Sequence, residues 1–242
     1  FDFAEDGGKT TSMSPAAFMA AFLERLPKQV DFREAAPGGE EALLVGFSGG
    51  LDSTVLLHRL AAGNRPRIRA IHVHHGLHPD ADAWAVHCQR DCDALGIELI
   101  IERVQLENAG LGREGTARAA RHAAFRRVLR DGEVLTLAHH RSDQAETFLL
   151  RALRGSGVDG LAAMRPWRAY ANGWLWRPLL DAPRNALRAH AHEHRLSWIE
   201  DPSNDDSSFD RNFVRTQVLP LLRTRWPQTD AAFARSAALS AD

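Results

Sequence analysis

Glycine, serine and aspartate are concentrated in one short segment, which reads Ser48-Gly49-Gly50-Leu51-Asp52-Ser53. Paired glycines let backbone N–H groups approach an anion closely, and serine hydroxyls add further donors. The lysine of the Walker phosphate loop is absent, and so is the third glycine of the dinucleotide-binding pattern. Since a carboxylate repels phosphate unless a cation lies between them, Asp52 predicts bound Mg²⁺. The alternative is an ordinary strand–helix turn in which Asp52 caps the helix.

A second polar segment, residues 139–147, reads HHRSDQAET. On a helix, His139, Asp143 and Glu146 would share one face. A histidine at this place can stabilise negative charge on phosphate, and carboxylates can hold Mg²⁺ or an amine substrate. Asp143 and Glu146 also match the D-x-x-E capping box, which is the structural alternative. The nearby glycine-rich segment favours the catalytic interpretation.

Two further segments contribute candidate residues. Residues 72–78 read HVHHGLH, but strand alternation separates their histidines, so a polar wall beside a nucleotide is favoured over zinc. The helix expected to open at 113 carries Arg118 and Arg121, which we expect to line the pocket. The alternative for Arg118 is an ordinary surface ion pair with Glu114.

Short apolar runs alternate with amphipathic segments and must position these residues. The pattern predicts strands at 42–47, 68–74, 97–104 and 133–138, with helices at 53–62, 79–95, 113–130 and 142–154. Apolar runs without polar alternation are typical of strands covered on both faces. The expected fold class is therefore α/β, a doubly wound parallel sheet whose ligands bind at the carboxyl ends of its strands.

Composition and periodicity divide the chain into three regions. Residues 1–35 are expected to form a flexible lead and an N-terminal helix, and 36–164 a nucleotide-binding catalytic domain. Residues 165–242 are expected to complete the substrate site with helices at 183–195, 212–222 and 228–241. The arginine- and tryptophan-rich stretch 165–177 is a candidate RNA contact, and its alternative is a hairpin that packs its own aromatic rings.

The composition is that of an ordinary globular protein. Its 242 residues are 44% hydrophobic and 25% charged, which argues against disorder. We find neither a membrane-length apolar run nor a signal peptide, and expect a cytoplasmic protein without a membrane partner. The formal net charge of −1 means that any contact with RNA must come from a local patch.

Taken together, the motifs resemble those of the tRNA(Ile)-lysidine synthetase family, within the PP-loop ATP pyrophosphatase superfamily. They cover residues 42 to about 226 and read SGGLDS, HVHHGL, EGTARAARHAAF, HHRSDQAET, RGSGVDGLAAM, RPLL and DPSNDDSSFDRNFVR. The resemblance implies an ATP-dependent ligase that forms a C–N bond. ATP adenylates the C2 oxygen of the wobble cytidine in the CAU anticodon of tRNA(Ile), and L-lysine then displaces AMP to leave lysidine.

The resemblance also implies a role for each candidate residue. Ser48, Gly49, Gly50, Leu51 and Ser53 would hold the phosphates of ATP, while Asp52 and Glu146 would bind Mg²⁺. His139 would stabilise charge at the α-phosphate, and Asp143 would orient the lysine ammonium. Arg118 and Arg121 would bind substrate, and Arg211 and Arg215 would face the lysine carboxylate or the RNA backbone.

Two other functions stay open. One is a related PP-loop tRNA-modifying enzyme such as a thiolase, which the C-x-x-x-C spacing of Cys88 and Cys92 does not favour. The other is a non-catalytic nucleotide-binding module. The sequence leaves the oligomeric state open, with a homodimer as one option. Since the last helix has no cap and the family often carries further C-terminal RNA-binding regions, we expect a chain cut from a longer protein.

Overall fold

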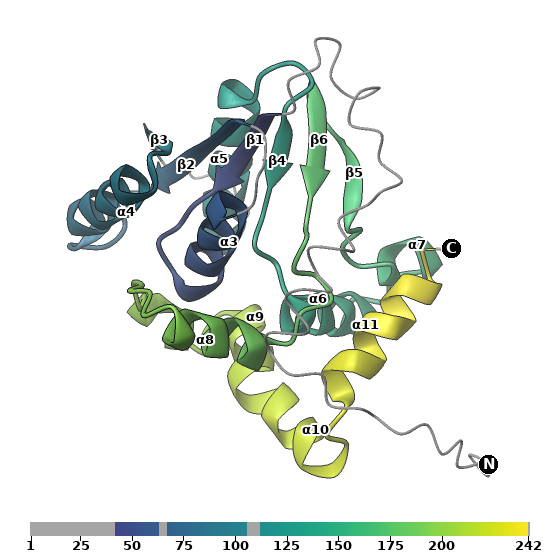
Figure 1. Ribbon diagram of the computed structural model, residues 1–242. Coiled ribbons are helices and arrows are strands. Elements are labelled where there is room, and N and C mark those ends of the chain that lie inside the picture. The colour runs from purple at the N-terminus through teal and green to yellow at the C-terminus, as the bar shows by residue number, and fades with distance from the viewer. Residues whose placement is uncertain (1–41, 63–66, 106–111, 242) are drawn as a thin grey trace.

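A six-stranded sheet in the order β3-β2-β1-β4-β6-β5 forms the centre of the molecule (Figure 1). The computed structural model describes residues 42–62, 67–105 and 112–241. The expected N-terminal helix and the region 1–35 therefore lie outside the described residues. The strands are β1 (Ala42–Gly46), β2 (Arg67–His74), β3 (Glu98–Arg103), β4 (Val134–Thr136), β5 (Trp167–Tyr170) and β6 (Gly173–Trp176).

The sheet is doubly wound, as the sequence predicts. β1 pairs in parallel with β2 on one side and with β4 on the other, so that the first described strand is central. β2 pairs in parallel with β3. The strand order therefore reverses between β1 and β4, and this is the place where such sheets bind ligands.

Helices cover both faces of the sheet because successive side chains of β1 point to opposite sides. On one face Val45 and Phe47 belong to a core that includes residues of α3 (Leu51–Ala62), α4 (Ala81–Leu95) and α8 (Arg184–Glu193). On the other face Leu44 packs with Phe125 of α5 (Gly112–Val128).

The remaining helices gather beyond the carboxyl ends of the strands (Figure 1). They are α6 (Arg141–Leu153), α7 (Val158–Leu161), the 3₁₀ turn η1 (Pro202–Asp205), α9 (Asp210–Phe213), the π-helical turn η2 (Val214–Val218), α10 (Leu219–Arg225) and α11 (Thr229–Leu239). Ala145 of α6 packs against Val214 and Leu219, which fixes η2 beside α6. No helix among the described residues combines the length and the apolar character that a bilayer span requires.

The aromatic and basic stretch forms the hairpin β5–β6, and this hairpin extends the sheet. β6 pairs in parallel with β4, placing Trp176 opposite Thr136. Trp167 stacks on Trp174 with ring centroids 5.6 Å apart, so the aromatic rings do pack among themselves. The sequence does not predict this pairing with β4. Contact with RNA and the domain boundary near 164 stay predictions.

Candidate nucleotide-binding site

A pocket of about 530 Å³ lies at the carboxyl ends of β1 and β4. Its walls come from the loop and first turn at 48–53, the arginines of α5, the end of β4, the start of α8, the segment 198–201 and η2. Its volume is within the range of small-molecule sites. Five arginines line it, namely Arg118, Arg121, Arg184, Arg188 and Arg215, which suits a polyanionic ligand.

Gly49 allows the loop after β1 to turn sharply beside neighbouring segments. Its φ is +80°, in the left-handed region that favours glycine. A Cβ on Gly49 would lie 2.5 Å from Cδ1 of Ile199 and 2.8 Å from Sγ of Cys88. The Ile199 N–H donates to the Gly49 carbonyl at 2.9 Å, so segment 198–200 and the loop are joined through their backbones.

The first turn of α3 faces the same pocket through Leu51, Asp52 and Ser53. The Ser53 hydroxyl donates to the Gly50 carbonyl at 3.0 Å and lies 3.1 Å from the Ser48 hydroxyl. First-turn N–H groups have no partner within their own helix, and the positive end of the helix dipole lies there. This turn therefore has the arrangement that favours an anion, and the binding of phosphate by the glycine–serine segment stays a prediction.

Asp52 presents a carboxylate to this arrangement. Its Oδ2 atom lies 3.5 Å from Nε2 of His140, whereas its Oδ1 atom is buried and has no hydrogen-bond partner among the described residues. A buried carboxylate oxygen without a partner is costly. Mg²⁺ prefers such oxygen ligands and completes its octahedron with phosphate and water oxygens, so Asp52 fits a magnesium ligand.

The first turn of α6 is capped by His140 and Asp143, so the alternative of a capping box between Asp143 and Glu146 does not hold. The His140 backbone is extended, its N–H donates to Oδ2 of Asp143 at 2.9 Å, and its ring Nδ1 accepts from the Asp143 N–H at 3.4 Å. Burial alone lowers the His140 pKa, but Asp143 and Asp52 outweigh burial and hold this pKa above its usual value. His140 thus links the loop after β1 to α6.

Two arginines of the C-terminal helices bind the two carboxylates of α6. Arg215 donates from Nε to Oε1 of Glu146 at 2.7 Å, and Arg211 donates from Nε to Oε2 at 2.8 Å. Both guanidiniums also lie 3.2 Å from Oδ1 of Asp143. Burial alone raises the Asp143 pKa, but His140, Arg211 and His139 outweigh burial and keep it well below its usual range. Asp143 is therefore ionised, and both carboxylates are paired with guanidinium groups.

His139 lines the pocket as an uncharged ring. Burial lowers the pKa of His139 to about 3, with Asp143 opposing the shift and Arg177 adding to it. Arg177 follows β6 and donates from Nε to Nδ1 of His139 at 3.3 Å. Because Nδ1 accepts this hydrogen bond, the ring proton lies on Nε2, which makes Nε2 a neutral hydrogen-bond donor.

The structure brings most of the candidate residues to one site. Ser48, Gly50, Leu51, Asp52, Ser53, Arg118, Arg121, His139 and Arg215 all line the pocket. Among the predicted residues that the structure describes, Gly49, Asp143, Glu146 and Arg211 do not line it. Asp143 and Glu146 are joined to the pocket through Arg215, and Arg211 binds the same two carboxylates. The side chain of Glu114 lies outside the described residues.

Sequence reasoning missed Arg184 and Arg188, which line the pocket from the start of α8. Their four-residue spacing puts both on one helix face, and this spacing was the available signal. It also missed the position of Arg177. The stretch 165–177 was expected to contact RNA, but Arg177 is buried and hydrogen-bonded to His139. Nothing in the local pattern at 165–177 marks one arginine for burial.

The two cysteines of α4 are buried beneath the loop after β1. Burial, with Asp91 and Asp93 adding to it, raises the pKa of the Cys92 thiol to about 12. Burial also raises the pKa of Cys88, whose Sγ lies 3.4 Å from Nδ1 of His72. Both thiols are therefore protonated core side chains at neutral pH, unlike reactive or metal-binding thiolates.

Comparison with known proteins places this site in a family. Residues 24–222 match the model of the PP-loop domain. The chain is 64% identical over 212 residues to a tRNA(Ile)-lysidine synthase from Xanthomonas axonopodis pv. citri (strain 306), covering 86% of this chain and 48% of that protein. It is 58% identical over 203 residues to a tRNA(Ile)-lysidine synthase from Xylella fastidiosa (strain 9a5c), covering 82% of this chain and 46% of that protein. The chain thus spans about half the length of these curated relatives.

Solved structures show the same fold at low sequence identity. The U34-tRNA thiolase NcsA from Methanococcus maripaludis, solved with its [4Fe-4S] cluster, superposes with a TM-score of 0.70 at 17% identity, over 92% of this chain and 78% of that chain. An NH3-dependent NAD synthetase from Campylobacter jejuni superposes with a TM-score of 0.50 at 15% identity, over 95% of this chain and 97% of that chain. At these identities the likeness concerns the fold alone.

Proposed function

The chain belongs to the PP-loop domain family, and from this membership together with its similarity to tRNA(Ile)-lysidine synthases we propose that it carries the catalytic site of such an enzyme. The reaction would have two steps. The C2 oxygen of the wobble cytidine attacks the α-phosphorus of ATP, and pyrophosphate leaves with the electron pair of the broken P–O bond. The ε-amine of L-lysine then attacks C2, loses a proton and expels AMP, which leaves lysidine.

The observation that carries this proposal is the carboxylate of Asp52 at a phosphate-binding helix start. A buried oxygen without a partner, in a pocket with five arginines, favours a cation held between Asp52 and a polyphosphate. Mg²⁺ bound there would neutralise charge on the phosphates and polarise the bond to the leaving pyrophosphate. The Ser48 and Ser53 hydroxyls and the first-turn N–H groups of α3 would hold the remaining phosphate oxygens.

His139 would donate from Nε2 to the α-phosphate as negative charge builds there. Its lowered pKa keeps the ring neutral, so it would act as a hydrogen-bond donor and not as a cation. The bond from Arg177 to Nδ1 would hold this tautomer. Arg118 and Arg121 remain candidate contacts for the phosphates of ATP or of RNA.

Asp143, Glu146, Arg211 and Arg215 would form the part of the site that receives lysine. An arginine released from Asp143 would bind the lysine carboxylate, and the Asp143 oxygen thus exposed would orient the ammonium group. Glu146 was predicted to bind Mg²⁺ together with Asp52. Because both of its oxygens are bonded to arginines, that role would require Arg211 and Arg215 to turn away.

The partners proposed with this activity are tRNA(Ile) with a CAU anticodon, ATP and free L-lysine. These substrates occur together in the cytoplasm, which we propose as the location. The arginines of the hairpin β5–β6 and of α8 are the proposed RNA contacts, since guanidinium groups pair with phosphate, whereas the tryptophan rings of the hairpin pack against one another. No membrane partner is proposed, and a homodimer stays an open expectation.

The test is mass analysis of the anticodon loop after incubation of the chain with tRNA(Ile), ATP, Mg²⁺ and isotope-labelled lysine. We expect label in the wobble nucleotide, with AMP and pyrophosphate released in equal amounts. Pyrophosphate release that depends on a sulfur donor and not on lysine would instead identify a thiolase. ATP binding without pyrophosphate release under either condition would identify a non-catalytic module.

A further inference from the structure

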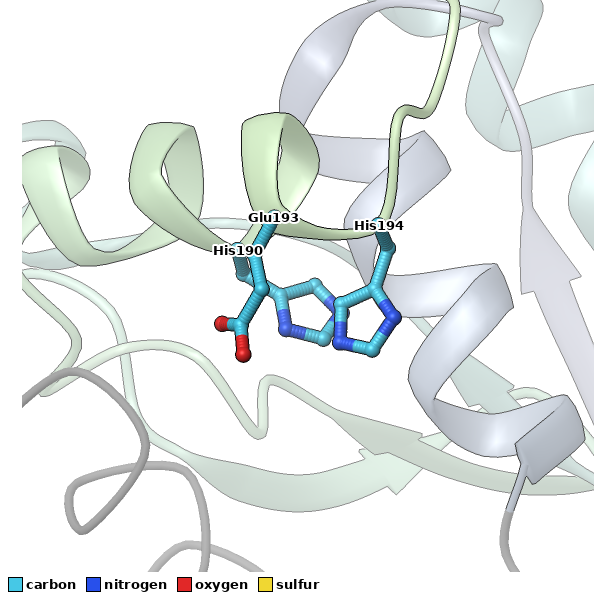
Figure 2. Close-up of side chains that lie close together, drawn as sticks. All are labelled: His190, Glu193 and His194. Atoms are coloured by element: carbon cyan, nitrogen blue, oxygen red, sulfur yellow. The ribbon is translucent and has the colours of Figure 1, made fainter.

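Three side chains that bind metals converge at the carboxyl end of α8, away from the nucleotide pocket. His190 and His194 are one helical turn apart, so both rings lie on one face of α8, and Glu193 projects to the same side (Figure 2). The ring centroids of His190 and His194 are 4.2 Å apart. One donor atom from each of the three residues lies within 4.8 Å of the other two.

A fourth imidazole, that of His58, lies on the neighbouring helix α3, close to His190, and its donor atom would have to move toward the other two residues to join the group of three. Nδ1 of His58 lies 3.2 Å from Nε2 of His190, and the rings of His58 and His194 are 4.9 Å apart. Zn²⁺ binds imidazole nitrogen at about 2.0–2.1 Å, so two donors at a tetrahedral angle are about 3.3 Å apart. The separation between His58 and His190 already matches that value.

The charges around the cluster and its exposure to solvent bear on whether a cation can bind there. The positive charge of Arg59 would repel a bound cation, and the carboxylate of Glu193 lies close enough to Arg59 to offset that charge. His190 is buried, whereas Glu193 and His194 are exposed, which gives an ion a path from solvent.

We propose that His58, His190, Glu193 and His194 bind a zinc ion that ties α8 to α3. The ion would replace the proton shared between His58 Nδ1 and His190 Nε2, and it would take a third nitrogen from His194 and an oxygen from Glu193. Three imidazoles and one carboxylate form a ligand set that suits tetrahedral Zn²⁺ and does not suit Mg²⁺ or Ca²⁺.

Such an ion would stabilise the wall of the nucleotide pocket from a distance. α3 begins with the phosphate-binding turn, and α8 begins with Arg184 and Arg188, which line the pocket. α3 and α8 already share the buried core of one sheet face. A metal clamp between their opposite ends would fix the distance between the two arginines and the phosphate-binding turn.

The experiment uses untagged protein stripped with EDTA, because a histidine tag would bind zinc itself. Zinc alone is titrated, bound metal is counted by plasma mass spectrometry, and thermal unfolding is followed with and without zinc. We expect one zinc per chain and a midpoint that rises by several degrees. With Co²⁺ in place of zinc, we expect the visible absorption of a tetrahedral site.

His194→Gln should weaken zinc binding by at least about tenfold, since even the loss of outer-shell partners costs ~10–100-fold. His194 is exposed, so this variant should keep its fold, which circular dichroism can verify. His192→Gln is the matched control, because His192 lies on the same helix and packs on Trp198. Less than one zinc per chain at micromolar metal, or equal affinity of His194→Gln and the parent protein, would overturn the proposal.

Discussion

At the scale of single residues, Glu146 is bonded through both of its carboxylate oxygens to arginines, which a role as a metal ligand does not require. Its side chain is 1% exposed, and both of its oxygens accept hydrogen bonds from guanidinium groups. Removing one member of a buried ion pair leaves the other charge without compensation. Glu146 therefore has a structural role that can be measured without metal or substrate.

We expect Glu146→Gln to lower the free energy of unfolding by about 1–3 kcal/mol in metal-free buffer, because two partly buried guanidiniums lose their counter-charge. Urea unfolding measures this change, with Glu200→Gln at an exposed position as the control. An unchanged or increased stability would mean that Glu146 is an unpaired carboxylate kept for Mg²⁺.

For Asp52 we expect a loss of activity in place of a loss of stability, because its buried Oδ1 atom has no hydrogen-bond partner that a substitution would leave unpaired. Asp52→Asn should reduce ATP-dependent pyrophosphate release by about 100-fold or more, because a metal contact at the phosphates contributes several kcal/mol to the transition state. Asp82→Asn is the matched control, since Asp82 is exposed and pairs with Arg103. Equal loss of activity in both variants would contradict the role of Asp52 as a ligand.

Sequence spacing identified most of the single residues and missed their pairing. Arg211 and Arg215 are more than sixty positions from Glu146, so no local pattern reports that they meet. The alternative of a capping box from Asp143 to Glu146 does not form because His140 is the N-cap, and histidine is not among the side chains preferred at that position. Arg177 was missed for the same reason as the first pair, since its partner His139 follows β4 and is 38 positions away in the sequence.

At the scale of elements, the loop after β1 depends on a segment far along the chain. Gly49 packs against Ile199, and their backbones are hydrogen-bonded. A side chain at Gly49 would therefore disturb both the left-handed turn and this contact.

Gly49→Ala should destabilise the fold by about 2–4 kcal/mol, combining a strained φ with a clash in the core. It should also weaken ATP binding. Gly76→Ala is the matched control, because Gly76 also has a positive φ, +65°, but a Cβ there meets nothing within 4 Å. The control should cost only about 1–2 kcal/mol. Equal destabilisation of the two variants in urea would show that the contact with Ile199 is unimportant.

Most elements could be predicted because strands and helices differ in hydrophobic period and in length. The four strands β1 to β4 and the helices between them, as far as they are described, follow the predicted order within a few residues. The addition of β5 and β6 could not be predicted, since parallel pairing between β4 and β6 joins residues about forty positions apart and leaves no turn signal.

At the scale of the whole molecule, several buried histidines share one direction of pKa change. The pKa values of His75, His122 and His190 are lowered to about 4 and that of His139 to about 3, mainly by burial. In the unfolded chain each would take up a proton near the ordinary histidine pKa of 6.5. Protonation therefore favours the unfolded state as the pH falls below that value.

We expect the thermal midpoint in EDTA to fall steadily from about pH 7 to about pH 5. Carboxylates such as Asp143 change the stability only at a lower pH, near the pKa that they have in the unfolded chain. The change in midpoint between about pH 7 and pH 5 therefore reports on the histidines. His140 acts in the opposite sense, because its raised folded pKa adds stability at low pH. A midpoint that is constant or rises over this range would contradict the burial of the neutral rings.

The distance along the chain between the two sides of the pocket has a consequence for biosynthesis. The phosphate-binding turn leaves the ribosome early, whereas Arg184, Arg188, Ile199 and Arg215 follow more than 130 residues later. A growing polypeptide therefore has no complete cradle for nucleotide until η2 has emerged and docked on α6. Translation intermediates arrested before that point should be unable to turn over ATP, which separates synthesis of the protein from the onset of its chemistry.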